Sequence, residues 1–279
     1  MSSAVGPLVK RAGMLVDRVV PPPAGITVLI YHRVGGGSPS AVDLEPDVFE
    51  RQLAHLAEHH RVLPLEDALA ELAVASSGFG PEGEREPSSP GVVITFDDGT
   101  TDFTEVAVPA LVRHGLPATL YAATQFIDEG TEFPWGAPPA TWTALREATS
   151  TGLISIGSHT HSHWLLDRLD PAEIESDLDR SIDLIGSNIG TVPLDFAYPK
   201  AMPGSPAAEI AVRRRFRSAS LAANRVNRPG RTDAHRLWRT PVQQSDDDRC
   251  FAAKASGGLR LEGELRALLA SVRYRGAAR

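Results

Sequence analysis

The sequence predicts an α/β protein built around a parallel sheet, on the strength of two similar segments. In the first, residues Gly91 to Phe96 form a short uncharged run that passes directly into the adjacent carboxylates Asp97 and Asp98. Its β-branched and aromatic residues are typical of a strand covered on both faces. In the second, an apolar segment beginning at Ile154 runs into three histidines. Because residues just past the carboxyl ends of parallel strands commonly form active sites, both polar ends are candidate site residues.

The other elements follow from the alternation of apolar runs and helical patterns. Residues 1–24 are expected to be an N-terminal arm ending in a proline spacer, and residues 25–279 a single domain. The clearest helix start is Asp170-Pro171-Ala172-Glu173, with an N-cap, a proline at the first position and a glutamate at the third. Further strands are predicted at 26–31, 118–124, 195–199, 216–221 and 237–242, and further helices from 46, over 65–72, 106–114 and 141–152, and over 259–274.

Four segments between or beside these elements have distinctive compositions. Residues 35–40 are rich in glycine and serine and are predicted to be a flexible loop. Residues 76–90 shift to Gly, Pro, Ser and Glu, which indicates a surface loop. The arginines of residues 213–217 are most simply a solvated helix face. Trp135, in the aromatic and proline-rich segment 131–139, either stacks on a sugar ring or packs its own loop down.

Composition excludes several classes of function. The net charge of -7 and pI of 5.7 argue against a nucleic-acid partner, which needs a basic surface. The single cysteine, Cys250, excludes an intramolecular disulfide and a cysteine-based metal site. No apolar run approaches the roughly 18 residues of a membrane span, so no stable membrane insertion is expected. Residues 1–25 lack the pattern of a secretion signal, so the expected localisation is cytoplasmic. Oligomeric state stays open.

The histidine segment predicts a metal site together with the carboxylates. His159 and His163 are four residues apart, so one helical turn would place both on the same face, and His161 would point elsewhere. A carboxylate and two neutral imidazoles form a common ligand set for a catalytic divalent ion, which makes Asp98, His159 and His163 the predicted ligands. The alternatives are an ordinary Asp-Asp-Gly turn and hydrogen-bonded or solvated histidines.

These residues carry a family resemblance. Thr95-Phe96-Asp97-Asp98-Gly99, followed by His159-Thr160-x-x-His163, resembles the polysaccharide deacetylases, the fourth family of carbohydrate esterases, which share the NodB-homology domain. The resemblance implies an irregular (β/α)7-type barrel. It also implies that Asp97 is the general base and that Asp98, His159 and His163 hold a divalent metal ion, zinc first, with cobalt, manganese or nickel also acceptable.

The resemblance assigns the remaining groups less directly. The family's C-terminal Leu-x-His motif, which supplies the general acid, is missing, but Tyr31-His32-Arg33-Val34 is similar to the Tyr-His-x-Val motif of one branch. That similarity implies His32 as the acid; the alternative is a packed strand-end histidine. Residues 196–199 resemble the same branch's third motif and imply the Tyr198 N–H as oxyanion donor, although Lys200-Ala201 replaces its x-Gly. Residues 237–242 resemble the segment that brings an arginine, here Arg239, beside the base; the alternative is a surface arginine.

The function implied is a metal-dependent hydrolase that removes N-acetyl groups from an N-acetylated amino-sugar polysaccharide or glycoconjugate, with a carbohydrate as its partner. Two other functions stay open. One is a deacetylase of a small N- or O-acetylated glycoside or lipid-linked sugar. The other is an inactive barrel that binds glycans. The sequence does not distinguish the sugar, the chain length or the native metal, because fold class settles none of them.

Overall fold

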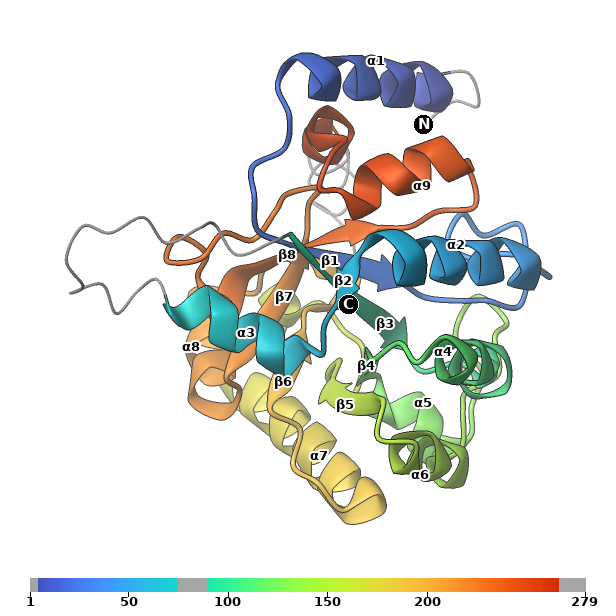
Figure 1. Ribbon diagram of the computed structural model, residues 1–279. Helices are drawn as coiled ribbons and strands as arrows, with labels where there is room; N and C mark the ends of the chain where they lie inside the picture. Colours follow the sequence, from blue (N-terminus) through green and yellow to red (C-terminus); the bar gives the residue numbers. More distant parts are fainter. Residues whose placement is uncertain (1–4, 75–89, 266–279) are drawn as a thin grey trace.

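The protein, described here by a computed structural model of residues 5–74 and 90–265, is a closed barrel of parallel strands (Figure 1). The first strand pairs in parallel with both β3 and β8. The ladder then runs from β8 through β7, β6, β5 and β4 back to β3, so that seven strands close on themselves, and the short β2 pairs with the start of β3. The predicted irregular barrel is confirmed. The strands are β1 (Ile26–Tyr31), β2 (Arg61–Val62), β3 (Gly91–Asp98), β4 (Ala118–Ala122), β5 (Ile154–Ser158), β6 (Asp195–Ala197), β7 (Ser218–Ala222) and β8 (Leu237–Pro241).

Helices surround the barrel on its outside (Figure 1). Most connect one strand to the next, as parallel neighbours require. The α-helices are α1 (Val5–Val19), α2 (Pro46–His59), α3 (Leu65–Val74), α4 (Val108–His114), α5 (Thr124–Glu129), α6 (Trp142–Ser150), α7 (Pro171–Ile189), α8 (Pro206–Arg215) and α9 (Asp248–Ala255). A π-helical turn, η2 (Phe103–Ala107), leads into α4, and the short 3-10 turns are η3 (Leu166–Arg168), η4 (Pro199–Ala201) and η5 (Ala234–Arg236).

The best-predicted helix is also the best-capped one. Asp170 accepts hydrogen bonds from the N–H groups of Ala172 and Glu173, and Glu173 accepts one from the Asp170 N–H, which completes the expected capping box. The sequence patterns did not predict the helices α1, α5 and α9. Of the helix predicted over 259–274, residues 260–265 are helical and the rest lies outside the described residues. The loop predicted over 76–90 lies outside them as well, except for Pro90.

A buried ionic cluster fixes the first helix to the last part of the barrel. Lys10 of α1 donates to Asp246 at 2.6 Å, and Lys254 of α9 donates to the other Asp246 oxygen at 2.8 Å. Burial alone would raise the pKa of Asp246, but the two ammonium groups outweigh it and hold that pKa below its usual value. The predicted N-terminal arm therefore contains a helix that is docked through a charge pair, and Figure 1 shows α1 lying alongside α9.

Two segments are more ordered than their composition predicted. The glycine-rich loop at 35–40 was predicted to be flexible, but the buried Asp43 carboxylate accepts hydrogen bonds from four of its consecutive backbone N–H groups, at 2.9 to 3.3 Å. The arginines at 213–217 are not simply solvated. Arg213 pairs with Asp233, Arg215 pairs with Asp179 and Glu175, and Arg217, which lies beyond the helix, pairs with Asp195. The glycine content of the loop and the charge of the arginines did not predict these carboxylate partners.

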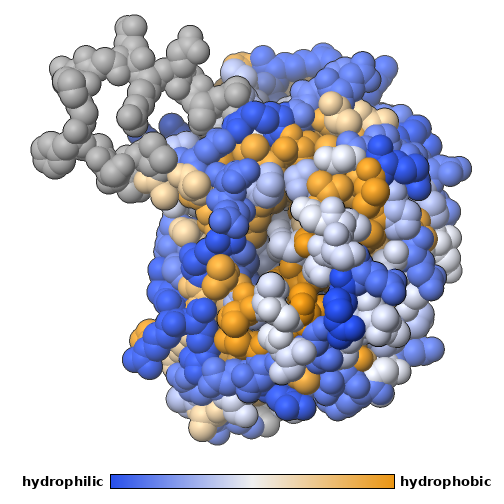
Figure 2. Space-filling model, turned by 60° about the horizontal axis from the view of Figure 1, so that its bottom comes forward, coloured by the Kyte–Doolittle hydropathy of each residue, from blue (hydrophilic) through white to orange (hydrophobic). Residues whose placement is uncertain are grey.

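The largest core cluster lies between the early strands and the helices that cover them. Its aromatic centre is formed by Tyr31, Phe49, Phe96 and Phe103, whose ring centroids lie 4.9 to 5.9 Å apart. Figure 2 shows hydrophobic residues gathered around a hollow in the middle of one face, within a largely hydrophilic surround. Among the described residues, no helix combines the length and apolar character needed to cross a membrane.

Candidate metal centre

The end of β3 brings two carboxylates to one edge of the barrel. Asp97 and Asp98 are the last paired residues of the strand, opposite Tyr121 and Ala122 of β4. The chain then turns sharply, because Asp98 has a φ of 75° and Gly99 a φ of 96°. A left-handed conformation is costly for a residue with a side chain and is concentrated at functional sites. Both carboxylates lie near the same imidazole, with His159 Nε2 3.9 Å from Asp97 Oδ2 and 3.7 Å from Asp98 Oδ1.

The histidine segment is a loop, not the helical turn that the spacing suggested. His159 follows β5 directly and donates its N–H to Ala122 O at 2.9 Å. Thr160 and His163 both have positive φ, at 69° and 60°, and the His163 N–H is capped by the Thr160 hydroxyl oxygen at 2.9 Å. These bends bring the His159 and His163 rings to a centroid separation of 5.0 Å. As predicted, His161 points elsewhere, with its Nδ1 3.1 Å from the Thr124 hydroxyl.

The three predicted metal ligands meet at one point. His163 Nε2 lies 3.3 Å from Asp98 Oδ1, and His159 Nε2 lies 3.7 Å from the same oxygen. One ligand atom from each residue fits within 4.8 Å of the other two. Within residues 5–74 and 90–265, no other cluster of three His, Cys, Asp or Glu side chains meets this condition. The side chains are 2 to 7 % exposed, so the cluster is shielded from bulk water.

The protonation state of His159 suits a metal ligand. Its Nδ1 lies 2.7 Å from the Ala197 carbonyl oxygen, which can only accept, so Nδ1 carries the proton and Nε2 presents a lone pair to the cluster. Burial lowers the pKa of His159 to about 4, so the ring is neutral at pH 7. Burial would raise the pKa of Asp98, but the hydrogen bond and charge of His163 reverse this and keep it ionised. A carboxylate and two imidazole nitrogens fit a divalent cation.

Asp97 is held by an arginine from β8, a strand that only β1 separates from β3 in the barrel. Arg239 of β8 donates to the two Asp97 oxygens at 2.6 and 2.9 Å, and its guanidinium lies 5.0 Å from the centre of the Tyr121 ring. Arg239 is fully buried, so it is not an ordinary surface arginine, and the predicted contact with Asp97 is present. Burial would raise the pKa of Asp97, but Arg239 and His159 outweigh it, and the carboxyl stays ionised.

His32 lies at the same end of the barrel. Tyr31 is paired with Phe96, so His32 follows β1 at the level where Asp97 follows Phe96 on β3. The charge of His32 contributes to lowering the pKa of both Asp97 and Asp98. Its Nδ1 is buried without a hydrogen-bond partner. Closure of the barrel through the β1–β8 and β1–β3 pairs therefore brings the first strand to the predicted ligands.

The hydrogen bonding of the Tyr198 N–H differs from the prediction. Its N–H, predicted to face an oxyanion, donates to Ser220 O at 3.2 Å and so extends the β6–β7 ladder by one residue. Its ring packs edge-on against Phe196 in a hydrophobic cluster under α7 and α8. A substrate oxygen could use this N–H only by sharing or breaking the bond to Ser220.

Sequence reasoning missed the residue that shapes the histidine loop. Asp177 of α7, only 9 % exposed, accepts hydrogen bonds from the N–H groups of His161 and Ser162, both at 2.9 Å. The signal was present in the helix pattern, because Asp177 lies three residues after Ile174 and next to Leu178, on the side of α7 that faces the barrel. An acid within a buried helical stripe needs a partner, and here that partner is the loop that carries the ligands.

A shallow pocket borders the histidine loop. It has a volume of about 380 Å³ and is lined by residues of that loop, including Trp164, and by Glu173, Asp177 and Arg180 of α7. On the other side of His163, Trp135 lies with its ring centroid 6.0 Å from the imidazole and is stacked on Phe133 at 5.1 Å. The exposed Trp135 ring therefore lies close to one of the predicted ligands.

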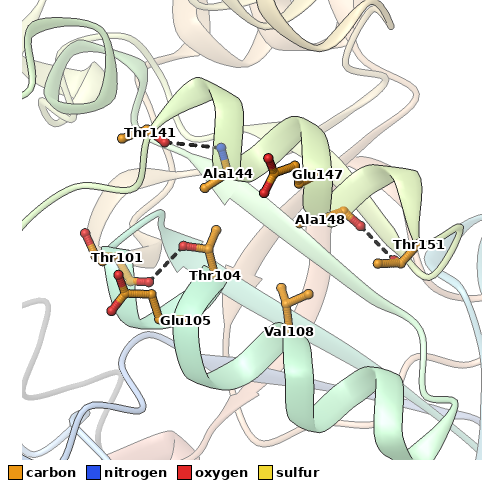
Figure 3. Close-up of a pocket in the computed structure, with 9 residues that line it drawn as sticks. All are labelled: Thr101, Thr104, Glu105, Val108, Thr141, Ala144, Glu147, Ala148 and Thr151. Atoms are coloured by element: carbon orange, nitrogen blue, oxygen red, sulfur yellow. Dashed lines mark hydrogen bonds between the residues drawn. The ribbon is translucent and has the colours of Figure 1, made fainter.

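A second pocket of about 370 Å³ is unconnected with these residues. It lies between α6 and the segment formed by η2 and α4 (Figure 3). The hydroxyls of Thr104, Thr141 and Thr151 are hydrogen-bonded to nearby backbone groups, as the dashed lines in Figure 3 show. The charged groups that line it, Glu105 and Glu147, have the same sign. This groove between helices does not resemble a catalytic site.

Comparison with known proteins agrees with this arrangement. Residues 84–216 match the family model described as polysaccharide deacetylase. These residues make up a little under half of the chain. Over 177 residues the chain is 27 % identical to YxkH of Bacillus subtilis (strain 168), which is described as a putative polysaccharide deacetylase. This match covers 63 % of the chain and 57 % of YxkH, so it spans little more than half of that relative. His32 and Arg239 lie outside the residues that match the family model.

Solved structures of deacetylases share this barrel. The deacetylase PplD of Streptococcus pyogenes, solved in complex with acetate, superposes with a TM-score of 0.69 at 22 % identity, over 84 % of this chain and 99 % of that one. IcaB from Ammonifex degensii superposes with a TM-score of 0.68 at 24 % identity, over 85 % and 98 %. At these identities the likeness establishes the (β/α)7 fold.

Proposed function

We propose that this protein is a metal-dependent hydrolase that removes N-acetyl groups from an N-acetylated amino-sugar polysaccharide or glycoconjugate and releases acetate. The observation that carries the proposal is the cluster of Asp98, His159 and His163, with Asp97 and its arginine beside it. Structural ion pairs alone give no reason for two histidines and a carboxylate to converge in one buried cluster. The match of residues 84–216 to the polysaccharide deacetylase family model supports the same reaction.

Asp98, His159 and His163 would hold the ion, through one carboxylate oxygen and the two Nε2 atoms. When bound, a divalent ion supplies Lewis-acid charge and makes water more acidic. Asp97 takes the proton of the attacking water, since both of its oxygens are fixed by Arg239 and its pKa is held low enough for it to be ionised at neutral pH. Because Arg239 is fully buried, this carboxylate keeps one orientation.

His32 donates the proton that the departing amine needs. It reaches the cluster from β1, on the opposite side of Asp97 from β4, and its buried Nδ1 has no competing hydrogen-bond partner. Acid and base catalysis each contribute roughly 10²–10⁴ in rate, so the reaction depends on both groups. Stabilisation of the oxyanion by the Tyr198 N–H is the least supported role, because Ser220 already accepts that hydrogen.

The surroundings of the cluster favour a carbohydrate. Trp135, close to His163, is 37 % exposed, and Trp164, which lines the shallow pocket beside the histidine loop, is 43 % exposed. Flat aromatic rings provide contact surface for the apolar face of a sugar, and the charged residues Glu173 and Arg180 in the shallow pocket offer hydrogen-bonding groups for hydroxyls. An open groove of this kind suits a glycan better than a small enclosed substrate.

Acetate release tests the proposal. Purified protein is incubated with N-acetylglucosamine oligomers of increasing length and with soluble N-acetylglucosaminides, with and without chelator, and bound metal is measured in parallel. We expect chelator-sensitive release, restored by added zinc, cobalt, manganese or nickel, and lost in Asp98→Ala. Asp183→Ala, which removes an exposed carboxylate on α7, is the matched control and should release acetate as the wild type does.

The substrate series separates the possible outcomes. Release only from single glycosides would favour a small acetylated glycoside over a polymer. Stoichiometric metal with no release from any sugar would favour a barrel that only binds glycans. If the protein binds no divalent ion and Asp98→Ala releases acetate like wild type, the proposed centre is wrong.

A further inference from the structure

The first helix presents an apolar face that the proposed reaction does not use. Of the eleven large hydrophobic side chains that are exposed in the part of the chain that the structure describes, four lie within six positions at the end of α1: Leu15, Val16, Val19 and Val20, which are 43 to 81 % exposed. The spacing of three and four residues places Leu15, Val16 and Val19 on one side of the helix. Apolar side chains gathered in this way commonly mark an interaction surface.

The opposite side of α1 is fixed to the body of the protein. Lys10 donates to Asp246 at 2.6 Å and to the Ser245 carbonyl oxygen at 3.0 Å, and Asp17 accepts a hydrogen bond from the Leu259 N–H at 2.7 Å. Lys10 and Asp17 are seven residues apart, about two helical turns, so both lie on the docked side. Figure 1 shows α1 at the edge of the molecule, beyond α9. The apolar face is therefore carried by a helix that is already formed and anchored.

The charges beside the apolar face are positive. Arg11 and Arg18 are exposed and, because they are seven residues apart, they line the same edge of it. From Arg11 to the end of the helix every exposed side chain is apolar or an arginine, and the acid in this stretch, Asp17, is bonded on the docked side. The neighbouring segment adds the exposed side chains of Arg260 and Leu261. This surface is opposite in sign to the net charge of -7 of the whole chain.

The charge pattern distinguishes between possible partners of this face. A second copy of the chain packed on it would set arginines against arginines, and like charges across an interface are unfavourable. A single helix of 15 residues also offers less than the roughly 20–30 residues that each partner contributes to a stable protein interface. An anionic membrane surface fits both features, because apolar side chains enter the boundary of headgroups and acyl chains while arginines at the edge stay among the phosphates.

We propose that the apolar face of α1, with Arg11 and Arg18 at its edge, binds the surface of a membrane that contains anionic lipids. The helix lies in the plane of that surface and does not cross it. Because α1 is anchored through Lys10 and Asp17, the barrel is held at the membrane together with the helix. Each arginine near an anionic surface contributes about fivefold to the binding constant. The proposal is independent of the deacetylase function.

Co-sedimentation of the full chain with vesicles tests the proposal. One set of vesicles is phosphatidylcholine alone, and the other contains equal parts of phosphatidylcholine and phosphatidylglycerol. We expect the partition coefficient to be about tenfold or more higher for the anionic vesicles and to fall with added salt. Leu15→Gln/Val19→Gln should lower binding to the anionic vesicles by about tenfold or more, because two apolar side chains are lost from the contact. Arg11→Gln/Arg18→Gln should remove most of the preference for anionic lipid.

Matched substitutions elsewhere on the surface are the controls. Val192→Gln/Leu194→Gln removes two exposed apolar side chains between α7 and β6, and Arg214→Gln/Arg231→Gln removes two exposed arginines outside α1. Both variants should bind the vesicles as the wild type does. All the substituted side chains are exposed, so the urea midpoints of the α1 variants should stay near that of the wild type.

A fluorescent label identifies the face that touches the lipid. Cys250 is the single cysteine of the chain, it is buried, and burial raises its pKa to about 12, so it does not compete for a thiol-reactive dye. Val16→Cys and Val192→Cys are each labelled with a dye whose emission depends on the polarity around it. Anionic vesicles should shift the emission to the blue in labelled Val16→Cys and leave it unchanged in labelled Val192→Cys.

The outcomes distinguish a lipid partner from a protein partner. Binding that is confined to anionic vesicles and lost in the α1 double variants supports the proposal. Absence of vesicle binding, equal binding to both vesicle types, or binding that survives both double variants overturns it. Self-association in sedimentation velocity that Leu15→Gln/Val19→Gln abolishes, with vesicles left unbound, also overturns it, because the apolar face of α1 is then covered by a second copy of the chain.

Discussion

Arg239 and Asp97 form a two-pronged ion pair across the inside of the barrel, with N–O distances of 2.6 and 2.9 Å. One residue comes from β8 and the other from β3, strands that are both neighbours of β1. Both side chains are buried, so the pair is shielded from water and from salt. This contact fixes the direction of the carboxylate to which we assign the base.

Replacing Arg239 with lysine keeps the charge and removes the fork. We expect Arg239→Lys to lower kcat/KM for acetate release by about 10² or more, because Asp97 is no longer held at both oxygens. Stability to urea should fall by about 1.5–3 kcal/mol, the contribution of a hydrogen bond to a charged group. Arg217→Lys is the matched control, since Arg217 also donates two hydrogen bonds to one carboxylate, that of Asp195. Arg217 is partly exposed and has no assigned part in the reaction. An equal loss of activity in both variants would contradict the assignment.

The histidine loop predicts that neighbouring histidines differ in metal binding. His163→Ala removes one ligand, and we expect metal affinity to fall by more than about 100-fold, beyond the 10–100-fold typical of groups that only support a ligand. His161→Ala removes a ring that contacts Thr124 and faces away from the cluster, so bound metal should stay near one per chain. Metal content after dialysis measures both. Equal loss in the two variants would mean that loop folding, not ligation, is being measured.

His32 is expected to act on protons and not on the metal. His32→Ala should lower kcat by about 10²–10⁴ while leaving metal stoichiometry unchanged. The effect should shrink for substrates with a more acidic leaving group, because these need less protonation. His114→Ala, which removes a histidine paired with Glu50 on the outer surface, serves as the comparison and should retain full activity. Loss of metal in His32→Ala would indicate a ligand instead of an acid.

Three histidines at the end of α2 predict that the free energy of unfolding decreases at acidic pH. His55 lies 4.7 Å from His59 and 5.4 Å from His60 between ring centroids, and burial first, then neighbouring imidazoles, lowers the pKa of His55 and of His60. The unfolded chain therefore binds more protons as the pH falls below about 6.5, and stability falls with it. In His55→Gln/His60→Gln, unfolding free energy should decline less steeply between pH 7 and 5. A slope that is unchanged in the double variant would contradict the assignment.

The left-handed turn after Pro199 predicts an uncommon stabilising substitution. Ala201 has a φ of 54°, which costs an alanine about 1–2 kcal/mol, while glycine adopts it freely but loses more entropy on folding. We expect Ala201→Gly to raise the free energy of unfolding by roughly 0.5–1 kcal/mol. Ala144→Gly in α6 should lower it by about the same amount, because glycine is unfavourable within a helix. Urea denaturation of both variants is the measurement; a loss of stability in Ala201→Gly would show that the turn is not strained.

Local sequence patterns predicted most of the strands, several of the helices and the residue types of the site. Local signals were enough for β3, β5 and the capped start of α7, because uncharged runs and capping boxes act within a few residues. The paired motifs around Asp97 and His159 resemble the polysaccharide deacetylases and predict three ligands, whose side chains the structure brings together. The helix α1 and the ion pairs of residues 213–217 were not predicted, because their partners lie far away in the chain. The order of residues 35–40 was not predicted either, although its partner Asp43 is close in the sequence.

Only the tertiary structure decided how the site is assembled. The contact of Arg239 with Asp97 was expected, but its fork geometry and complete burial follow from barrel closure, which brings β8 and β3 to either side of β1. The spacing of His159 and His163 suggested a helical turn, and the structure has a loop held by Asp177 in its place. The Tyr198 N–H is engaged by Ser220, and Lys200 covers Trp135. Such contacts join residues distant in the sequence, and local patterns carry no information about how the closed sheet positions them.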